Sequence, residues 1–183
     1  MRQLLDRLYA VSGAIAALFI VAICAIVLLQ VGFNLVDRIA QLVTGRAIGL
    51  VVPSYAEFAG FFLAAASFFA LADTLSSGNH IRVNLVIQRV PERQRPLIEA
   101  WSCLLGALVS GYFTFWAGNL VWESFEFGDL SPGIIAVPLW LPQLSMALGL
   151  LCLTICFIDL FVQVCRGEQP SYRTHEETLA GEE

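Results

Sequence analysis

Few side chains in this sequence could carry out chemistry, and their positions argue against catalysis. Histidine occurs only at His80 and His175, so the paired intramembrane histidines that haem ligation requires are absent. The five cysteines show no spacing typical of a zinc site, and the sequence holds neither a phosphate-binding glycine loop nor a nucleophile elbow. These patterns predict a protein that is not an enzyme and binds no cofactor.

The carboxylates are the remaining groups that could move an ion across a membrane. An ion-coupled transporter needs ionisable groups or broken helices near mid-membrane. All five acids within or beside the long apolar runs lie near the ends of those runs instead: Glu57, Asp73, Glu99, Glu123 and Asp159. We therefore expect them to be interfacial residues, and we expect no permeation path within this chain alone. A chain of this kind would act by binding another membrane component.

Long apolar segments must position these groups. Hydrophobic residues make up 58% of the sequence and charged residues 14%, and the mean hydropathy is +0.75. This composition predicts an all-α integral membrane protein. Four transmembrane helices are expected, at about 8–33, 55–75, 97–122 and 142–164, in one membrane domain over residues 1–166. The first run is too long for a signal peptide and is interpreted as an uncleaved span.

Two polar stretches flank these spans. Residues 36–45 show a helical apolar stripe, which fits either a separate amphipathic interfacial helix or a continuation of a long, tilted first helix. Residues 167–183 are acid-rich and cannot build a core, so a disordered tail is expected there. The net charge of −5 gives no reason to expect a nucleic-acid partner.

The second and third expected spans carry signals for helix ends and helix contacts. Ser54 and Glu57 have the spacing of a capping box at the start of the second span. A small-residue face follows along that span, comprising Ala56, Gly60, Ala64 and Ser67. It would let another helix approach closely, either from a partner or from this chain's own bundle. Trp101 and Trp122 are separated by about 31 Å of helix, so they are expected to anchor the third span at the two membrane interfaces.

Arginine placement predicts the orientation, because arginine-rich short loops stay on the cytoplasmic side. Eight of the ten basic residues, all arginines, fall on one side of the predicted spans. This places both termini and the loop 76–96 in the cytoplasm. Within that loop a short in-plane helix is expected, whose Arg82 and Arg89 would contact phospholipid head groups. The opposite loop carries Glu123, Glu126 and Asp129 without a basic residue, and leads into the proline-flanked Trp140. Further candidates for contact with a partner or with lipid are Glu57, His80, Glu126, Asp129 and Trp140.

Several of these features together resemble the small membrane subunit of TRAP (tripartite ATP-independent periplasmic) transporters, the DctQ-like family. The resemblance rests on the four-span layout, on Glu57 at the start of the second span, and on two motifs. The first motif follows the second span and has the sequence Gly78-Asn79-His80-Ile81-Arg82-Val83-Asn84. The second motif opens the fourth span and has the sequence Pro138-Leu139-Trp140-Leu141-Pro142. Two departures are a single acid at Glu57 where the family often has two, and Asn84 where an Asp is common.

The resemblance implies a three-part importer in the bacterial inner membrane. A periplasmic binding protein would deliver an organic acid, usually a carboxylate, to a large membrane subunit that uses the sodium gradient. The small subunit would hold the scaffold of the large one. Two other interpretations remain open: a four-span adaptor or sensor without a transport role, and a small self-assembling multidrug-type transporter. The second would need an acid within the first span, and residues 8–36 contain none.

Overall fold

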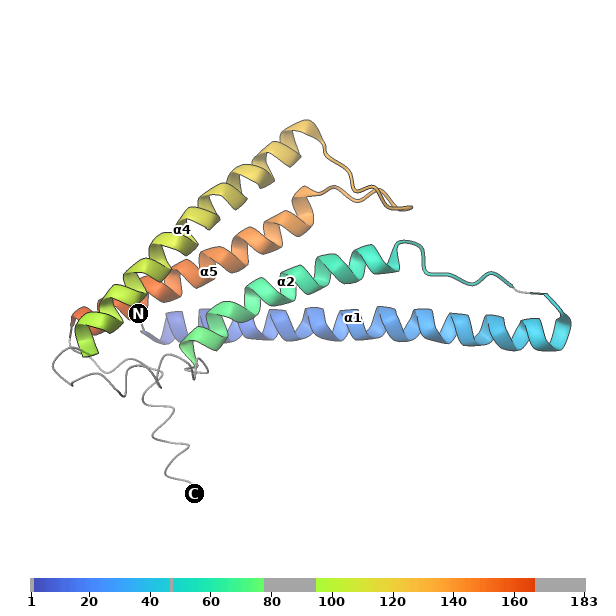
Figure 1. The fold of residues 1–183 in the computed structure, drawn as a ribbon, viewed down its shortest axis with the longest axis horizontal. Helices are drawn as coiled ribbons and strands as arrows, with labels where there is room; N and C mark the ends of the chain where they lie inside the picture. Colours follow the sequence, from blue (N-terminus) through green and yellow to red (C-terminus); the bar gives the residue numbers. More distant parts are fainter. Residues whose placement is uncertain (1, 47, 78–94, 167–183) are drawn as a thin grey trace, which may run out of the picture.

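The computed structural model describes residues 2–46, 48–77 and 95–166 of the 183-residue chain. Over these ranges it contains four long helices and no strand (Figure 1). Their bounds are α1 Arg2–Thr44, α2 Tyr55–Ser76, α4 Arg95–Phe127 and α5 Trp140–Cys165. Each helix is long and apolar enough to cross a membrane, which confirms the predicted all-helical, four-span architecture. The predicted tail and the predicted in-plane helix lie outside the described residues.

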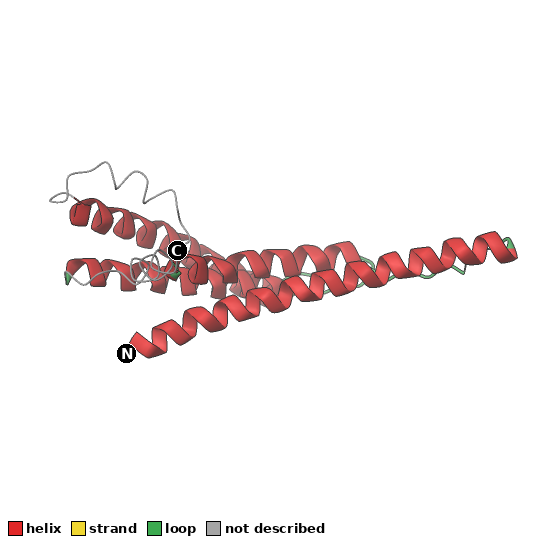
Figure 2. Cartoon of the chain, turned by 90° about the horizontal axis from the view of Figure 1, so that it is seen from below, coloured by secondary structure: helices red, strands yellow, loops and turns green. Residues whose placement is uncertain are grey.

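Helix α1 is longer than the span predicted for it. It runs without interruption through residues 36–44 (Figure 2). These residues therefore continue a long first helix, and they do not form a separate interfacial helix. Gly45 ends it with a φ of 71°, a conformation that glycine adopts without strain. At 1.5 Å per residue α1 is about 64 Å long, roughly twice a 30 Å hydrocarbon core. Its far end therefore projects beyond α2 (Figure 1).

Two polar side chains of α1 hold the chain that returns from this projection. The Asp37 Oδ1 atom accepts hydrogen bonds from the backbone amides of Ile48 and Gly49, at 2.7 and 2.8 Å. Further along, the Gln30 Oε1 atom accepts from the amide of Val52 at 2.8 Å, while its Nε2 atom donates to Asn34. Gln30 thus binds the connector between α1 and α2 rather than a neighbouring helix.

The helices pack in the spatial order α1, α2, α5, α4, as two antiparallel hairpins side by side (Figure 1). We call the end that holds the chain's N-terminus the converging end, and the end where α2 and α5 begin the open end. Near the converging end the hairpins meet through a small core, formed by Tyr9, Ala72, Cys156 and Leu160. Toward the open end they diverge (Figure 1).

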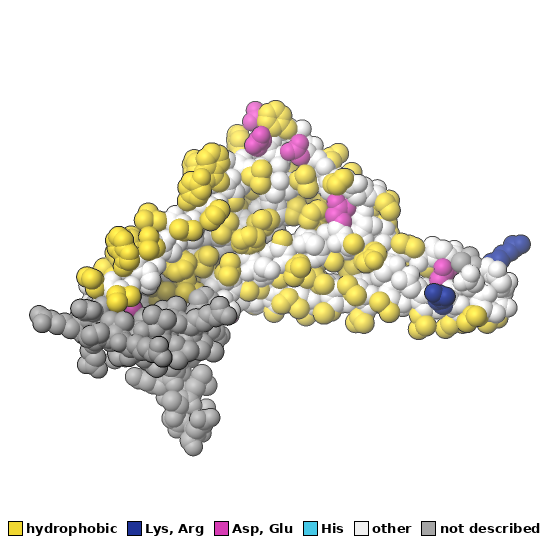
Figure 3. Space-filling model, in the orientation of Figure 1, with side chains coloured by type: hydrophobic (Ala, Val, Ile, Leu, Met, Phe, Trp, Pro, Cys, Tyr) yellow, Lys and Arg dark blue, Asp and Glu magenta, His cyan; other side chains and the backbone are white. Residues whose placement is uncertain are grey.

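Small residues set the close contacts between helices. A Cβ atom added to Gly149 of α5 would lie 2.7 Å from the backbone carbonyl carbon of Phe68 in α2. A Cβ atom on Gly13 would likewise lie 2.7 Å from the carboxylate of Asp73. The outward faces are broadly apolar (Figure 3), as expected for helices that lipid or a partner protein covers.

Candidate interaction site at the open end of the bundle

The two loops at the open end are joined by a hydrogen bond. The backbone amide of Ile135 donates to the hydroxyl of Ser54 at 3.0 Å. Ser54 has a φ of 56°, the left-handed conformation that is uncommon for any residue with a Cβ atom. The predicted capping box is therefore wrong: Ser54 makes no side-chain cap, and the amide of Glu57 donates to the Ser54 carbonyl instead. The hydroxyl is already used by the distant loop.

The loop between α4 and α5 is ordered by its own hydrogen bonds, with Ser131 at its centre. The Ser131 amide donates to the carbonyl of Val137 at 2.9 Å, and its hydroxyl accepts from the Val137 amide at 3.2 Å. A bridge pairs Leu130 with Pro138, and the Leu139 amide donates to the Asp129 carbonyl at 2.9 Å. Ser131 is 5% exposed. This loop can therefore hold a fixed position against Ser54.

Two acceptor atoms at this end lack a donor. Gly133 packs directly on the carboxylate of Glu57, in the first turn of α2, and leaves no room for a Cβ atom. The Glu57 Oε2 atom is buried there without a hydrogen-bond partner, and so is the Oε1 atom of Gln143 in the first turn of α5. A buried polar atom left unpaired costs about 1–3 kcal/mol. The first turns of α2 and α5 therefore each hold one buried acceptor atom without a hydrogen-bond donor.

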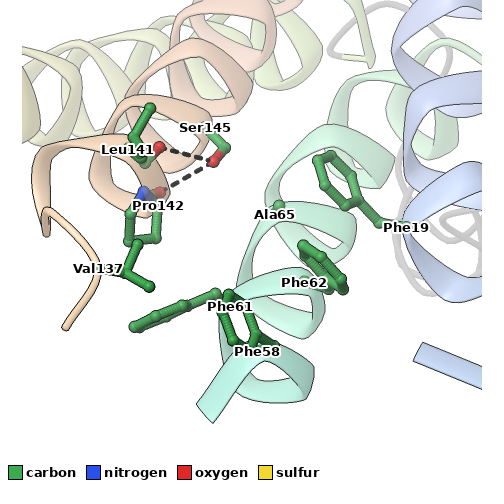
Figure 4. Close-up of a pocket in the computed structure, with 9 residues that line it drawn as sticks. All are labelled: Phe19, Phe58, Phe61, Phe62, Ala65, Val137, Leu141, Pro142 and Ser145. Carbon is green, nitrogen blue, oxygen red and sulfur yellow. Dashed lines mark hydrogen bonds between the residues drawn. The ribbon is translucent and has the colours of Figure 1, made fainter. Parts of the chain in front are cut away.

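An apolar cleft of about 240 Å³ lies between the two hairpins at the open end (Figure 4). Its walls come from α1, α2, α5 and the loop before α5, namely Phe19, Phe58, Phe61, Phe62, Ala65, Val137, Leu141, Pro142 and Ser145. The only hydroxyl among them belongs to Ser145, which bonds to the carbonyls of Leu141 and Pro142 in its own helix at 3.2 and 3.0 Å. The cleft wall thus offers hydrocarbon rather than polar contacts.

The predicted small-residue face of α2 points away from the other helices. Nothing lies within 4 Å of a Cβ atom built on Gly60, Ala56 and Ser67 are exposed, and Ala64 is half-buried. The face that α2 buries in the bundle is a different one, comprising Ala65, Ala66, Phe69 and Ala72. The interpretation in which Gly60 packs inside this chain's own bundle is therefore wrong. Its surface is open to a partner.

The other candidate contact residues that the structure describes lie at two opposite ends of the bundle. Trp122, Glu126 and Asp129 are exposed at the open end, where Trp140 packs edge-on against Phe125 with ring centroids 5.8 Å apart. Figure 3 shows acidic side chains gathered at that tip of the molecule. Trp101 is exposed in the first part of α4, toward the converging end. His80, Arg82 and Arg89 lie outside the described residues.

Sequence reasoning missed the orphan acceptor on Gln143, the contact of Gly133 with Glu57, and the cleft itself. Nothing in the local sequence marks Gln143, because a single amide among apolar residues is common at helix starts. The acids predicted to be interfacial do lie near helix ends. Asp73 packs on Gly13, and Asp159 accepts a hydrogen bond from the Gln163 amide nitrogen at 2.8 Å.

These features define a class: a multi-pass helical membrane protein, with four helices long and apolar enough to cross a bilayer in the part of the chain that the structure describes. The chain belongs to the family described as tripartite ATP-independent periplasmic transporters, DctQ component, whose model matches residues 39–167. No curated protein and no solved structure shows a significant match to the chain. The family is the small membrane component of TRAP transporters and works with a large membrane subunit and a periplasmic binding protein. This confirms the resemblance seen in the sequence.

Proposed function

We propose that this chain scaffolds the large permease subunit in sodium-driven, binding-protein-dependent uptake of an organic acid. The sodium gradient would be used by the large subunit, and the complex would lie in the bacterial inner membrane. Both termini would be cytoplasmic, as the arginine distribution favours. The open end would then face the periplasm, where a binding protein arrives.

The observation that carries this proposal is the unoccupied small-residue face of α2. Small residues on a transmembrane helix favour close helix–helix contact, because lipid gives no hydrophobic force between helices. Here Gly60 is open while α2 buries its opposite side against α1 and α5. A second helix surface is therefore available for a membrane partner.

The proposal is tested by reconstituting the chain, its large subunit and its binding protein into vesicles with an inward sodium gradient. Carboxylate uptake should require all three proteins, and the chain alone should transport nothing. A large subunit that is equally stable and equally active without this chain would contradict the scaffolding role. Collapsing the sodium gradient while leaving the proteins unchanged separates ion coupling from assembly.

A further inference from the structure

The outer face of α4 forms an edge of the bundle that no described helix covers. α4 stands last in the order α1, α2, α5, α4 and packs mainly on α5 (Figure 1). On its inner side Gly106 meets Phe157, and the Thr114 hydroxyl lies 3.0 Å from that of Thr154. Its outer side is exposed, and Figure 3 shows hydrophobic side chains along this edge of the molecule. A membrane component can therefore approach α4 from outside the bundle.

The residues along this outer face follow a heptad spacing. They recur at alternating steps of three and four residues, which places them in one line when two helices pair in a left-handed supercoil. All six positions within the hydrocarbon depth are exposed: Leu105, Leu108, Tyr112, Phe115, Asn119 and Trp122. We call these six residues the α4 seam. Because the spacing alone would suit lipid equally well, the polar members of the seam decide what covers it.

Two polar side chains of the α4 seam lie at membrane depth. Tyr112 is the middle residue of the apolar segment Leu97–Phe127, and Asn119 lies about 10 Å further along, within the half-thickness of about 15 Å. The Asn119 amide nitrogen donates to the Phe115 carbonyl at 3.1 Å. Its Oδ1 atom and the Tyr112 hydroxyl bond to no group among the described residues. Lipid tails offer neither donors nor acceptors, so a protein surface with polar groups fits this face better than lipid does.

The polar groups of the α4 seam complement those of a second copy. Two copies insert in the same orientation, so a twofold axis along the membrane normal brings α4 against α4 in parallel, with equal-numbered residues at equal depth. A carboxamide has two N–H donors and an acceptor oxygen. Asn119 uses one N–H within its own helix, and its other N–H and its Oδ1 atom can pair with the same atoms of a second copy. A single asparagine in a heptad seam fixes the register of a parallel pair in this way.

We propose that the α4 seam binds the same face of a second copy of this chain, in a parallel pair whose two Asn119 amides are hydrogen-bonded to each other. The two Tyr112 hydroxyls, each a donor and an acceptor, lie at equal depth in this pair. The seam is separate from the open surface at Gly60 on α2, which stays available to the large subunit. Pairing therefore does not rest on the scaffolding role, and either can fail without the other.

Pairing is measured on the full-length chain in lipid vesicles, by energy transfer between two fluorescent labels over a series of protein-to-lipid ratios. We expect the dissociation constant of the pair to rise about tenfold in Asn119→Leu, as the loss of an interhelical hydrogen bond in a membrane would give. Ser67→Leu is the control, because the exposed Ser67 hydroxyl also bonds to its own helix, at the Leu63 carbonyl, but lies on α2. The control should pair like the wild type, and circular dichroism checks that both variants are helical.

Cross-linking locates the contact independently of Asn119. In a background without the native cysteines, Leu108→Cys in the seam should form a disulfide-linked dimer when an oxidant is added to native membranes. Leu63→Cys on α2 should not, although Leu63 is 60% exposed and Leu108 62%. The Leu108→Cys dimer should form both with and without the large subunit.

Three results would overturn the proposal. Absence of wild-type pairing at every protein-to-lipid ratio would leave the α4 seam to lipid. A Leu108→Cys dimer that disappears when the large subunit is present would assign the seam to that subunit. Equal pairing in Asn119→Leu and Ser67→Leu would remove the amide contact on which the pair is built.

Discussion

The amide of Ile135 donates a 3.0 Å hydrogen bond to the hydroxyl of Ser54, across 81 residues of chain, and thereby links the two helical hairpins at the open end. Their helices are in close contact near Phe68 and Gly149, about halfway along the membrane-spanning length. The two loops therefore set how far the hairpins diverge. Changes at either contact should alter the stability of the bundle and the width of the cleft.

Ser54→Ala should destabilise the protein by about 0.5–1.5 kcal/mol, because the Ile135 amide loses its acceptor. Ser54→Gly removes the same hydrogen bond but relieves the left-handed backbone, whose cost for a residue with a Cβ atom is about 1–2 kcal/mol. We therefore expect the glycine variant to be more stable than the alanine variant. Thermal unfolding in detergent measures both, and an alanine variant that equals or exceeds the glycine variant would contradict the left-handed conformation.

Gly149→Ala should push α2 and α5 apart, because its Cβ atom meets backbone atoms of Phe68 rather than a side chain that could move. Overpacking of this kind costs typically about 1–3 kcal/mol. Gly118→Ala in α4 is the matched control, since nothing lies within 4 Å of its added Cβ atom. The same unfolding assay should show a loss for the first variant and none for the second. Equal stabilities would show that α2 and α5 are not in close contact there.

The parts of this fold that the sequence predicts are those that depend on local composition. The four apolar runs are long enough to specify spans by themselves, and α2 and α5 begin and end within two residues of the prediction. The sequence leaves the length of α1 open because no proline occurs before Pro53, and an amphipathic stripe fits both a straight and a bent continuation. Local pattern alone could not decide between them.

The features of the fold that the sequence did not predict depend on contacts between residues far apart in the chain. The capping box at Ser54 failed because its hydroxyl binds Ile135, which no spacing in the sequence indicates. The cleft could not be predicted, since it follows from the angle between two hairpins and from the place where Gly149 lets them touch. The outward direction of Gly60 likewise depends on which side of α2 meets α1 and α5.

Gly60→Leu should prevent assembly with the large subunit, and Ala64→Leu should weaken it. No described atom lies within 4 Å of a Cβ atom built on Gly60, so the isolated chain should accommodate the leucine, whereas a closely packed partner helix would be displaced. Gly118→Leu places the same bulk on an equally open surface of α4 and serves as the control. Co-purification with the large subunit is the measurement. If Gly118→Leu abolishes it and Gly60→Leu does not, the partner binds α4 rather than α2.

Single cysteines in a background without the native cysteines should report the orientation of the chain. Ser131 is a poor position because it is 5% exposed, whereas Ile134 in the same loop is 85% exposed. An impermeant thiol reagent added to intact cells should label Ile134→Cys and leave Ser77→Cys unlabelled until the cells are opened. The reverse pattern would place the open end in the cytoplasm and overturn the orientation that the arginines favour.

Two exposed acids at the open end, Glu126 and Asp129, form a surface that a periplasmic partner could contact. Glu126 lies in the last turn of α4 and Asp129 follows the end of that helix, and both side chains are exposed. Surface acids of this kind often do no more than keep a loop hydrated. They can also steer a basic patch of a binding protein through salt-sensitive attraction, which acts mainly on the rate of encounter.

Charge reversal separates these two roles. The double variant Glu126→Lys, Asp129→Lys should require several-fold more binding protein for half-maximal uptake at low salt, and the defect should shrink as salt screens the charges. Asp6→Lys is the control, because it reverses an exposed acid at the converging end, which a periplasmic protein cannot reach in the expected orientation. Uptake is measured against binding-protein concentration at two ionic strengths, with equal amounts of complex. An unchanged concentration dependence at low salt would leave the acids with hydration as their only role at this surface.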